Sequence, residues 1–348
     1  MGNLIKLSLK LINYLKDLKT SHSQWNGYLL VILAVIVFST IEVASQYVQR
    51  EEHVSAFDLS LLRFGIGGIF LIIAAFARVG KSEMLRIIKL DGWRIALLGL
   101  IGTTALALAY HRSLMLTSSM IGGAIFSINP AVVALIFLLL RVEKLSWSRV
   151  IGIILGIACV YITNKGARSH EPEFPDYLTG NLFMIGAVLS WSIYFFLIRD
   201  YLKKYSPVVV SAIAIVGGAF GLVLTVPLIP LLGWGDTLHF YKTLTPFGWG
   251  LVIYLGVVTV GLGYYWLYMG LSKTGVSKGM MIFFIKPALV ALLAHFLQHQ
   301  PLSKWIWIGI VLASASIVIV GMNGVKRNNH NTTFSVIKHK DTKVTKYL

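Results

Sequence analysis

The stretch Asn129–Leu135, which reads NPAVVAL, returns 157 positions later as Lys286–Leu292, which reads KPALVAL. Sequence identity at the same offset extends well beyond this phrase, since Gly99 falls on Gly256. A match that keeps its register over so many residues indicates an internal duplication rather than chance composition. Two copies of one unit therefore fill nearly the whole chain.

The composition shows what kind of unit has been duplicated. Hydrophobic residues make up 56% of the 348 positions, charged residues make up only 13%, and the mean hydropathy is +0.76. A soluble chain could not bury so much apolar surface, so the sequence predicts an integral membrane protein. Ten apolar stretches, each long enough to cross a hydrocarbon core of about 30 Å as a helix, are expected at residues 27–48, 58–79, 93–111, 117–140, 146–164, 178–198, 207–232, 247–270, 276–297 and 304–323.

The ten expected spans divide into two repeats of five, at residues 27–164 and 178–323. Because five is odd, each repeat ends on the opposite side of the membrane from where it began, so the second repeat must be inverted relative to the first. The predicted fold is therefore all-α, with ten transmembrane helices arranged as two inverted five-helix repeats. This arrangement is typical of secondary transporters.

The distribution of basic residues predicts the orientation. Of the 31 Lys and Arg residues, 23 lie in segments that share a side with the N-terminus, six lie on the other side, and Arg63 and Lys286 lie within spans. Since Lys and Arg are retained on the cytoplasmic side, both termini are expected in the cytoplasm, in a plasma (inner) membrane. We interpret the net charge of +17 as this topology signal and as contact with anionic lipids, not as nucleic-acid binding.

Three polar segments complete the predicted organisation. Residues 1–26 are expected to form a cytoplasmic amphipathic segment, residues 165–177 an outer linker, and residues 324–348 a cytoplasmic basic tail. Cys159 is the single cysteine, which excludes an intrachain disulfide and a cysteine-based structural metal site. No cofactor or metal is expected.

Several short motifs accompany the duplication. They are Leu62-Arg63-Phe64 near the start of the second span, the Asn-Pro and Lys-Pro centres of the fourth and ninth spans, and Glu143-Lys144-Leu145-Ser146. Over residues 25–323 the pattern resembles the EamA branch of the drug/metabolite transporter superfamily. The resemblance implies a ten-helix carrier whose central cavity is lined chiefly by helices one, three, four, six, eight and nine. It also implies a solute drawn from amino acids, nucleotide-like metabolites, sugars and drugs. In one departure, the position equivalent to Glu143 is Gln300.

Ionisable side chains inside spans point to functional positions, because each costs at least about 2.5 kcal/mol at the bilayer centre and is normally retained for a role. Glu42 and Arg63 are expected at a similar depth, toward the outer ends of helices one and two. Two interpretations stay open. The two side chains form a buried ion pair that locks the helices or the outer gate, or Glu42 titrates a coupling proton or contacts solute.

Lys286 is expected near the midplane of helix nine, directly before Pro287. A proline removes one backbone hydrogen bond and frees carbonyl groups that only a cavity or a partner helix can satisfy. Asn129 and Pro130 occupy the equivalent point of helix four, so two broken helices are expected to meet near the midplane around a binding site. Lys286 is interpreted either as an anchor for an anionic group of the solute or as a partner of Glu42.

Aromatic side chains at a comparable depth would suit flat or cationic solutes through stacking and cation–π contact. They are Phe38, Trp191, Tyr194, Tyr264, Tyr265 and Trp266, and of these Trp191 and Tyr265 are taken as candidate solute contacts. His295 and His299 are four positions apart, but no acid completes a metal-binding motif beside them. We interpret them as an interfacial pair.

The sequence favours a multi-pass secondary carrier that moves a small metabolite by alternating access. Its candidate solute contacts are Lys286, Asn129, Glu42, Trp191 and Tyr265, and its candidate gating or structural residues are Arg63, Pro130 and Pro287. The alternatives are a channel, or a membrane-embedded enzyme that uses Glu42, His111 or His295. No nucleotide-binding loop or nucleophile–base pair supports a pump or an enzyme.

The expected partners are a small-molecule solute and membrane lipids. Coupling to a proton stays open, and so does a homodimer formed through the small residues Gly152 and Gly156, because such a pair lets helices pack closely.

Overall fold

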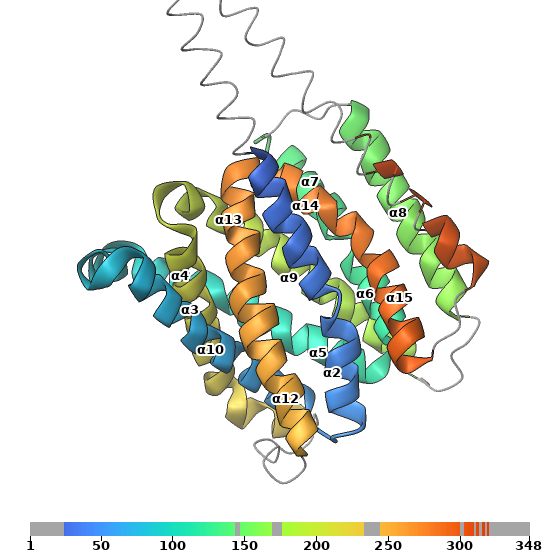
Figure 1. The fold of residues 1–348 in the computed structure, drawn as a ribbon, viewed down its shortest axis with the longest axis horizontal. Coiled ribbons are helices and arrows are strands. Elements are labelled where there is room, and N and C mark those ends of the chain that lie inside the picture. The colour runs from blue at the N-terminus through green and yellow to red at the C-terminus, as the bar shows by residue number, and fades with distance from the viewer. Residues whose placement is uncertain are drawn as a thin grey trace, which may run out of the picture.

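The computed structural model describes residues 24–142, 147–168, 176–232, 244–299 and 303–309, together with 311–312, 315–316 and 319. Within these residues every regular element is a helix (Figure 1). Most of the predicted amphipathic segment 1–26 and the tail 324–348 lie outside the described residues, as do Glu143 and Gln300.

Seven helical stretches of the described chain are long and apolar enough to cross a membrane: Gln24–Arg50, Ala56–Leu116, Ser119–Leu139, Tyr177–Lys204, Pro207–Leu228, Pro246–Thr274 and Val276–Gln298. The predicted all-α membrane fold is thereby confirmed. The count of ten spans stays a prediction. The expected spans 58–79 and 93–111 share one stretch, the span 146–164 is represented by the shorter apolar helix Val150–Cys159, and the span 304–323 lies largely outside the described residues.

The α-helices are α2 (Ile41–Arg50), α3 (Ala56–Ile87), α4 (Trp93–Gly99), α5 (Leu106–Leu116), α6 (Ser119–Phe126), α7 (Asn129–Leu139), α8 (Trp147–Arg168), α9 (Tyr177–Lys204), α10 (Pro207–Thr225), α12 (Pro246–Tyr254), α13 (Tyr264–Thr274), α14 (Val276–Met280) and α15 (Lys286–Gln298). The π-helical segments are η1 (Ile88–Gly92), η2 (Leu100–Ala105) and η5 (Leu255–Gly263), and the 3-10 segments are η3 (Val226–Leu228), η4 (Pro230–Leu232) and η6 (Met281–Ile285). Side chains of Ser55, Ser118 and Thr245 cap the N-termini of α3, α6 and α12, as short hydroxyl side chains commonly do.

The stretch Ala56–Leu116 cannot be one straight helix. Its 61 residues would extend about 90 Å at 1.5 Å per residue, about three times the hydrocarbon thickness. Gly80 has φ 78° and ψ 164°, a conformation that glycine adopts at little steric cost because it lacks Cβ. Since α3 packs against α5, the chain returns along itself, and the expected spans two and three become neighbours.

Helices four and nine are both broken where the duplicated phrase predicts. In helix four, two residues separate the end of α6 from the start of α7, and in helix nine the 3-10 segment η6 separates α14 from α15. Pro130 and Pro287 each lie near the start of the new helix and are buried. Because α6 packs against α15 and α7 packs against α14 and η6, the two broken helices lie against each other inside the protein.

Equivalent glycines allow close contacts between the two repeats. A Cβ atom on Gly99 would overlap the carbonyl oxygen of Ala214 in α10, and one on Gly256 would lie 2.7 Å from the Ile66 side chain in α3. Gly99 and Gly256 are equivalent positions of the duplication. The two halves of the duplication therefore make a close helix contact at the same equivalent position.

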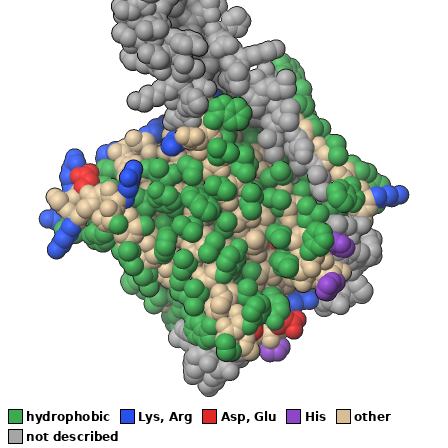
Figure 2. Space-filling view, viewed as in Figure 1, with side chains coloured by type: hydrophobic (Ala, Val, Ile, Leu, Met, Phe, Trp, Pro, Cys, Tyr) green, Lys and Arg blue, Asp and Glu red, His purple; other side chains and the backbone are tan. Residues whose placement is uncertain are grey.

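The outer surface of the described molecule is largely apolar. Green hydrophobic side chains cover most of the visible face, whereas charged and histidine side chains gather toward its margins (Figure 2). Ile69 is 65% exposed and Leu182 is 68% exposed. Such a surface suits contact with lipid tails rather than with water.

Candidate functional site

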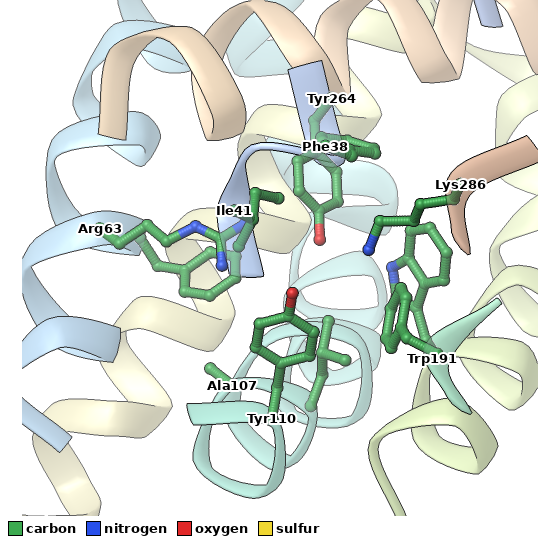
Figure 3. A pocket seen from close by; sticks show the side chains of 11 residues that line it. Phe38, Ile41, Arg63, Ala107, Tyr110, Trp191, Tyr264 and Lys286 are labelled. Carbon is green, nitrogen blue, oxygen red and sulfur yellow. The ribbon is translucent and has the colours of Figure 1, made fainter. Parts of the chain in front are cut away.

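A small cavity lies between helices of both repeats (Figure 3). Its walls come from the stretch Gln24–Arg50 and from α3, α5, α6, α9, α13 and α15, and the lining residues are Phe38, Ile41, Arg63, Phe64, Leu106, Ala107, Tyr110, Phe126, Trp191, Tyr264 and Lys286. The cavity volume is about 20 Å³, which is room for about one water molecule. A solute larger than water can enter only when the walls separate.

Glu42 and Lys286 form an ion pair at this cavity. Glu42 is the second residue of α2, which starts after a turn at Ser39 and Thr40 interrupts the first span, and Lys286 is the first residue of α15. The two side chains are 0% and 1% exposed. Removing each charge from water costs several kcal/mol, so each group depends on the other. The structure thus has the arrangement in which Lys286 pairs with Glu42, and the alternative ion pair between Glu42 and Arg63 is not formed.

Arg63 extends into the cavity from the side opposite Lys286 in Figure 3. The residue is 4% exposed. Its Nη1 atom lies 3.4 Å from Nε2 of His111, and its Cζ atom lies 5.0 Å from the ring centre of Phe64. Among the described residues no carboxylate forms a salt bridge with Arg63, and its Nε–H group has no hydrogen-bond partner. Arg63 is therefore a buried cation without a counter-ion in the described part of the chain.

Aromatic rings form most of the remaining wall. The hydroxyl groups of Tyr110 and Tyr264 both point into the space between Arg63 and Lys286 (Figure 3). The Lys286 Nζ atom lies 4.5 Å from the ring centre of Phe126, close enough for a cation–π contact. Trp191 lies with its ring centre 5.1 Å from that of Phe126. The site thus combines two cations, two phenol groups and flat apolar faces.

Asn129 lies outside the cavity wall and holds the break in helix four together. Its Nδ2 atom donates to the carbonyl of Phe126 at 2.8 Å, and its Oδ1 atom accepts from Ser192 Oγ at 2.8 Å. The Phe126 carbonyl is the one that Pro130 deprives of a helical donor. At the equivalent break, the Phe283 carbonyl accepts from the backbone N–H of Lys286. Both breaks are thus satisfied within the protein.

The other predicted residues are distributed as follows. Trp191 lines the cavity, whereas Tyr265 is half-buried outside the wall and its neighbour Tyr264 lines it instead. The Tyr194 hydroxyl is hydrogen-bonded to that of Tyr268. His295 is half-buried and His299 is exposed, and no group of side chains able to hold a metal ion occurs in the described residues.

Gly152 and Gly156, through which a homodimer stays open, both make contacts within the chain. A Cβ atom on Gly156 would overlap the Phe284 ring, and Gly152 accepts a hydrogen bond from Ser316 Oγ at its carbonyl oxygen, at 2.7 Å. The close approach that small residues permit is therefore used between helices of one molecule.

Sequence reasoning missed Tyr110 as a wall residue, and it considered His111 only for an enzyme. These two residues end the third expected span, on the same outer side of the membrane as Arg63, and this shared side was the available signal. The contacts among them come from α3 and α5, whose packing depends on the reversal at Gly80. The sequence pattern alone does not specify that reversal.

Comparison with known proteins identifies the class. The EamA-like transporter family matches the chain twice, over residues 25–165 and 178–322. A protein named as an uncharacterized transporter in Clostridium kluyveri is 23% identical over 87% of this chain and 95% of its own. The aromatic amino acid exporter YddG of Ancylobacter novellus is 25% identical over 78% of this chain and 88% of its own. A crystal structure with 22% sequence identity shares the fold at a TM-score of 0.67, covering 85% of this chain and 97% of that chain.

The fold and these matches define a multi-pass membrane transporter. The chain belongs to the EamA-like transporter family. Its relatives are named as transporters rather than enzymes, so the alternative of a membrane-embedded enzyme is set aside.

Proposed function

We propose that this protein is a secondary transporter that carries a small organic solute through the cavity of Figure 3 by alternating access. In this proposal it lies in a plasma (inner) membrane with both termini in the cytoplasm. The observation that carries the proposal is the buried ion pair between Glu42 and Lys286. It joins the first repeat to the second beside the cavity, so opening the cavity changes the surroundings of both charges.

The cavity volume supports a closed state in an alternating cycle. At about 20 Å³ the cavity holds about one water molecule, and a metabolite needs several times that volume. An open channel would keep a continuous water path. A carrier instead requires its walls to separate on one side at a time.

A counterflow experiment tests the proposal. Purified full-length protein in liposomes is loaded with millimolar unlabelled solute, and a library of labelled amino acids, aromatic acids, nucleosides and sugars is offered outside. We expect saturable accumulation of at least one class. Flux that never saturates would indicate a channel, and failure of every class to exchange would contradict the proposal. Protein-free liposomes and the variant Gly65→Ala, where nothing lies within 4 Å of the added Cβ, serve as controls.

We extend the proposal to proton coupling at Glu42, whose Oε2 atom has no hydrogen-bond partner among the described residues. A proton would bind there when the ion pair opens. We expect Glu42→Gln to abolish accumulation driven by a pH gradient while counterflow at equal pH persists. Unchanged gradient-driven accumulation in this variant would rule out coupling through Glu42.

A further inference from the structure

The Arg63 guanidinium is a charged group of the cavity that the protein leaves partly unsatisfied. It is buried, and its Nε–H has no acceptor in the described residues. Guanidinium stays charged at all physiological pH values and binds carboxylates with two parallel hydrogen bonds. A buried cation of this kind is expensive unless an anion joins it. Its unused donor therefore indicates a ligand.

His111 supports Arg63 without neutralising it. The Ser60 hydroxyl lies 2.7 Å from the Ala56 carbonyl, to which it donates, and 2.6 Å from Nδ1 of His111. Once Ser60 donates to Ala56, its oxygen accepts from an Nδ1–H group, and Nε2 is left as the acceptor for Arg63 Nη1. This assignment makes His111 neutral. His111 is thus a positioning residue that orients the guanidinium and leaves its charge free.

The charges around the cavity sum to one positive charge. Glu42 and Lys286 form a pair whose total is zero, whichever of the two holds the shared proton. Arg63 then contributes a further positive charge, and among the described residues it forms no salt bridge and its Nε–H group has no hydrogen-bond partner. One anionic group on a ligand would bring the cavity to neutrality. Glu42 is not among the residues that line the cavity, so the accessible wall presents cations and no carboxylate in the described residues.

The rest of the wall specifies the shape of the ligand. Phe38, Phe126, Trp191 and Tyr264 offer ring surfaces, which favour a flat apolar group. The hydroxyl groups of Tyr110 and Tyr264 point toward the space between the cations (Figure 3), where they can donate to carboxylate oxygens.

We propose that the cavity binds an aromatic monocarboxylate that carries no ammonium group, with its carboxylate held by Arg63 and by the tyrosine hydroxyls. The inference rests on the proposed transport function and narrows its substrate class. An amino acid would bring a second charge. Its ammonium group would lie near two cations and would leave the cavity with its positive charge uncompensated. The protein therefore prefers the acid to the zwitterion, in contrast to what the name of the aromatic amino acid exporter relative states of that protein.

Three probes with the same ring separate the possibilities by charge. Phenylacetate is an anion, phenylalanine is a zwitterion and phenethylamine is a cation. Binding to purified full-length protein in detergent is measured by isothermal titration calorimetry. We expect phenylacetate to bind at least about tenfold more tightly than phenylalanine, because a hydrogen bond to a charged group commonly changes binding by tenfold or more. Phenethylamine is expected not to bind.

Variants of α3 assign the effect to Arg63. We expect Arg63→Gln to weaken phenylacetate binding at least about tenfold, and Arg63→Lys to retain part of the affinity because it keeps the charge and loses the forked geometry. Arg78→Gln removes an exposed arginine from the same helix and should leave the affinity unchanged. Arg63→Gln removes an unbalanced buried charge, so its melting temperature should not fall.

The outcomes distinguish this inference from the transport proposal. Equal binding of all three probes, binding of none, or unchanged phenylacetate affinity in Arg63→Gln would overturn the carboxylate site. If phenylalanine or another solute exchanges in liposomes while phenylacetate neither binds nor exchanges, the transport function stands and the inference is wrong. Arg63-dependent binding of phenylacetate without exchange of any solute would support the site and contradict transport.

Discussion

At the scale of single residues, the main feature of the protein is a buried pair of opposite charges. Glu42 and Lys286 lie 244 positions apart and meet with almost no exposed side-chain surface. A buried ion pair adds little to the free energy of unfolding, because removing both charges from water offsets their attraction. Loss of one partner, however, leaves the other charge buried and uncompensated. The pair is thus a constraint on which combinations of residues the fold tolerates.

We predict that Lys286→Met lowers stability by about 3 to 5 kcal/mol, the usual effect of removing one partner of a buried pair. Glu42→Gln in the same chain should restore most of the loss, because no charge then remains unpaired. The thermal unfolding temperature of detergent-solubilised protein measures both effects. A single Lys286→Met variant as stable as the parent protein would contradict the pairing.

The sequence predicted part of this site. Position within a span was enough to select Glu42, Arg63, Lys286 and Trp191, because polar groups and rings at membrane depth are readable from the sequence. The sequence did not predict which cation pairs with Glu42, since this depends on how α2, α3 and α15 are rotated about their axes. For the same reason Tyr265 was chosen where Tyr264 lines the wall.

At the scale of helices, the duplication is visible as matched interruptions and matched contacts. The breaks before Pro130 and Pro287 were predictable because proline has a fixed local effect. The π-helical segments η2 and η5 were not predictable, since no residue type specifies such wider turns. They lie at equivalent places in helices three and eight, directly beside or including the equivalent glycines Gly99 and Gly256.

We predict that Gly99→Ala destabilises the protein, whereas Gly65→Ala does not. The added methyl group at position 99 would overlap the Ala214 carbonyl oxygen, but nothing lies within 4 Å of the one at position 65. In the open position alanine should even add roughly 0.5 to 1 kcal/mol, because glycine is the poorer helix former. Unfolding temperatures of the two variants, compared with the parent, give the answer. Equal unfolding temperatures for the two variants would show that α4 and α10 do not pack in close contact at Gly99.

At the scale of the whole molecule, composition and charge asymmetry predicted a multi-pass helical membrane protein, and this class is confirmed. The spans expected at 58–79 and 93–111 form one helical stretch in the structure, Ala56–Leu116, with non-helical backbone at Gly80, so their division into two spans stays a prediction. The number of spans and their orientation rest on the sequence argument, because residues 143–146, 169–175 and 233–243 lie outside the described residues.

Cysteine labelling tests the orientation. In a Cys159→Ser background, which removes the single cysteine, we expect a membrane-impermeant maleimide added to intact cells to label Asp176→Cys and not Lys203→Cys. Asp176 is exposed before α9, and the Lys203 side chain is 77% exposed near its other end. Permeabilised cells should label both, which controls for reactivity. External labelling at position 203 would reverse the topology.

The unbalanced guanidinium of Arg63 also has an electrical consequence. With the Glu42–Lys286 pair closed, the empty cavity carries one positive charge and the cavity loaded with a monocarboxylate carries none. The transmembrane voltage can act on a moving charge by as much as about 2.3 kcal/mol per 100 mV, so it acts on the return of the empty protein and not on the loaded step. We therefore expect net flux in liposomes, where the empty return is required, to vary with a potassium–valinomycin potential. Exchange of solute for solute should be insensitive to that voltage. The membrane potential, together with the solute gradient, would then determine the direction of net transport.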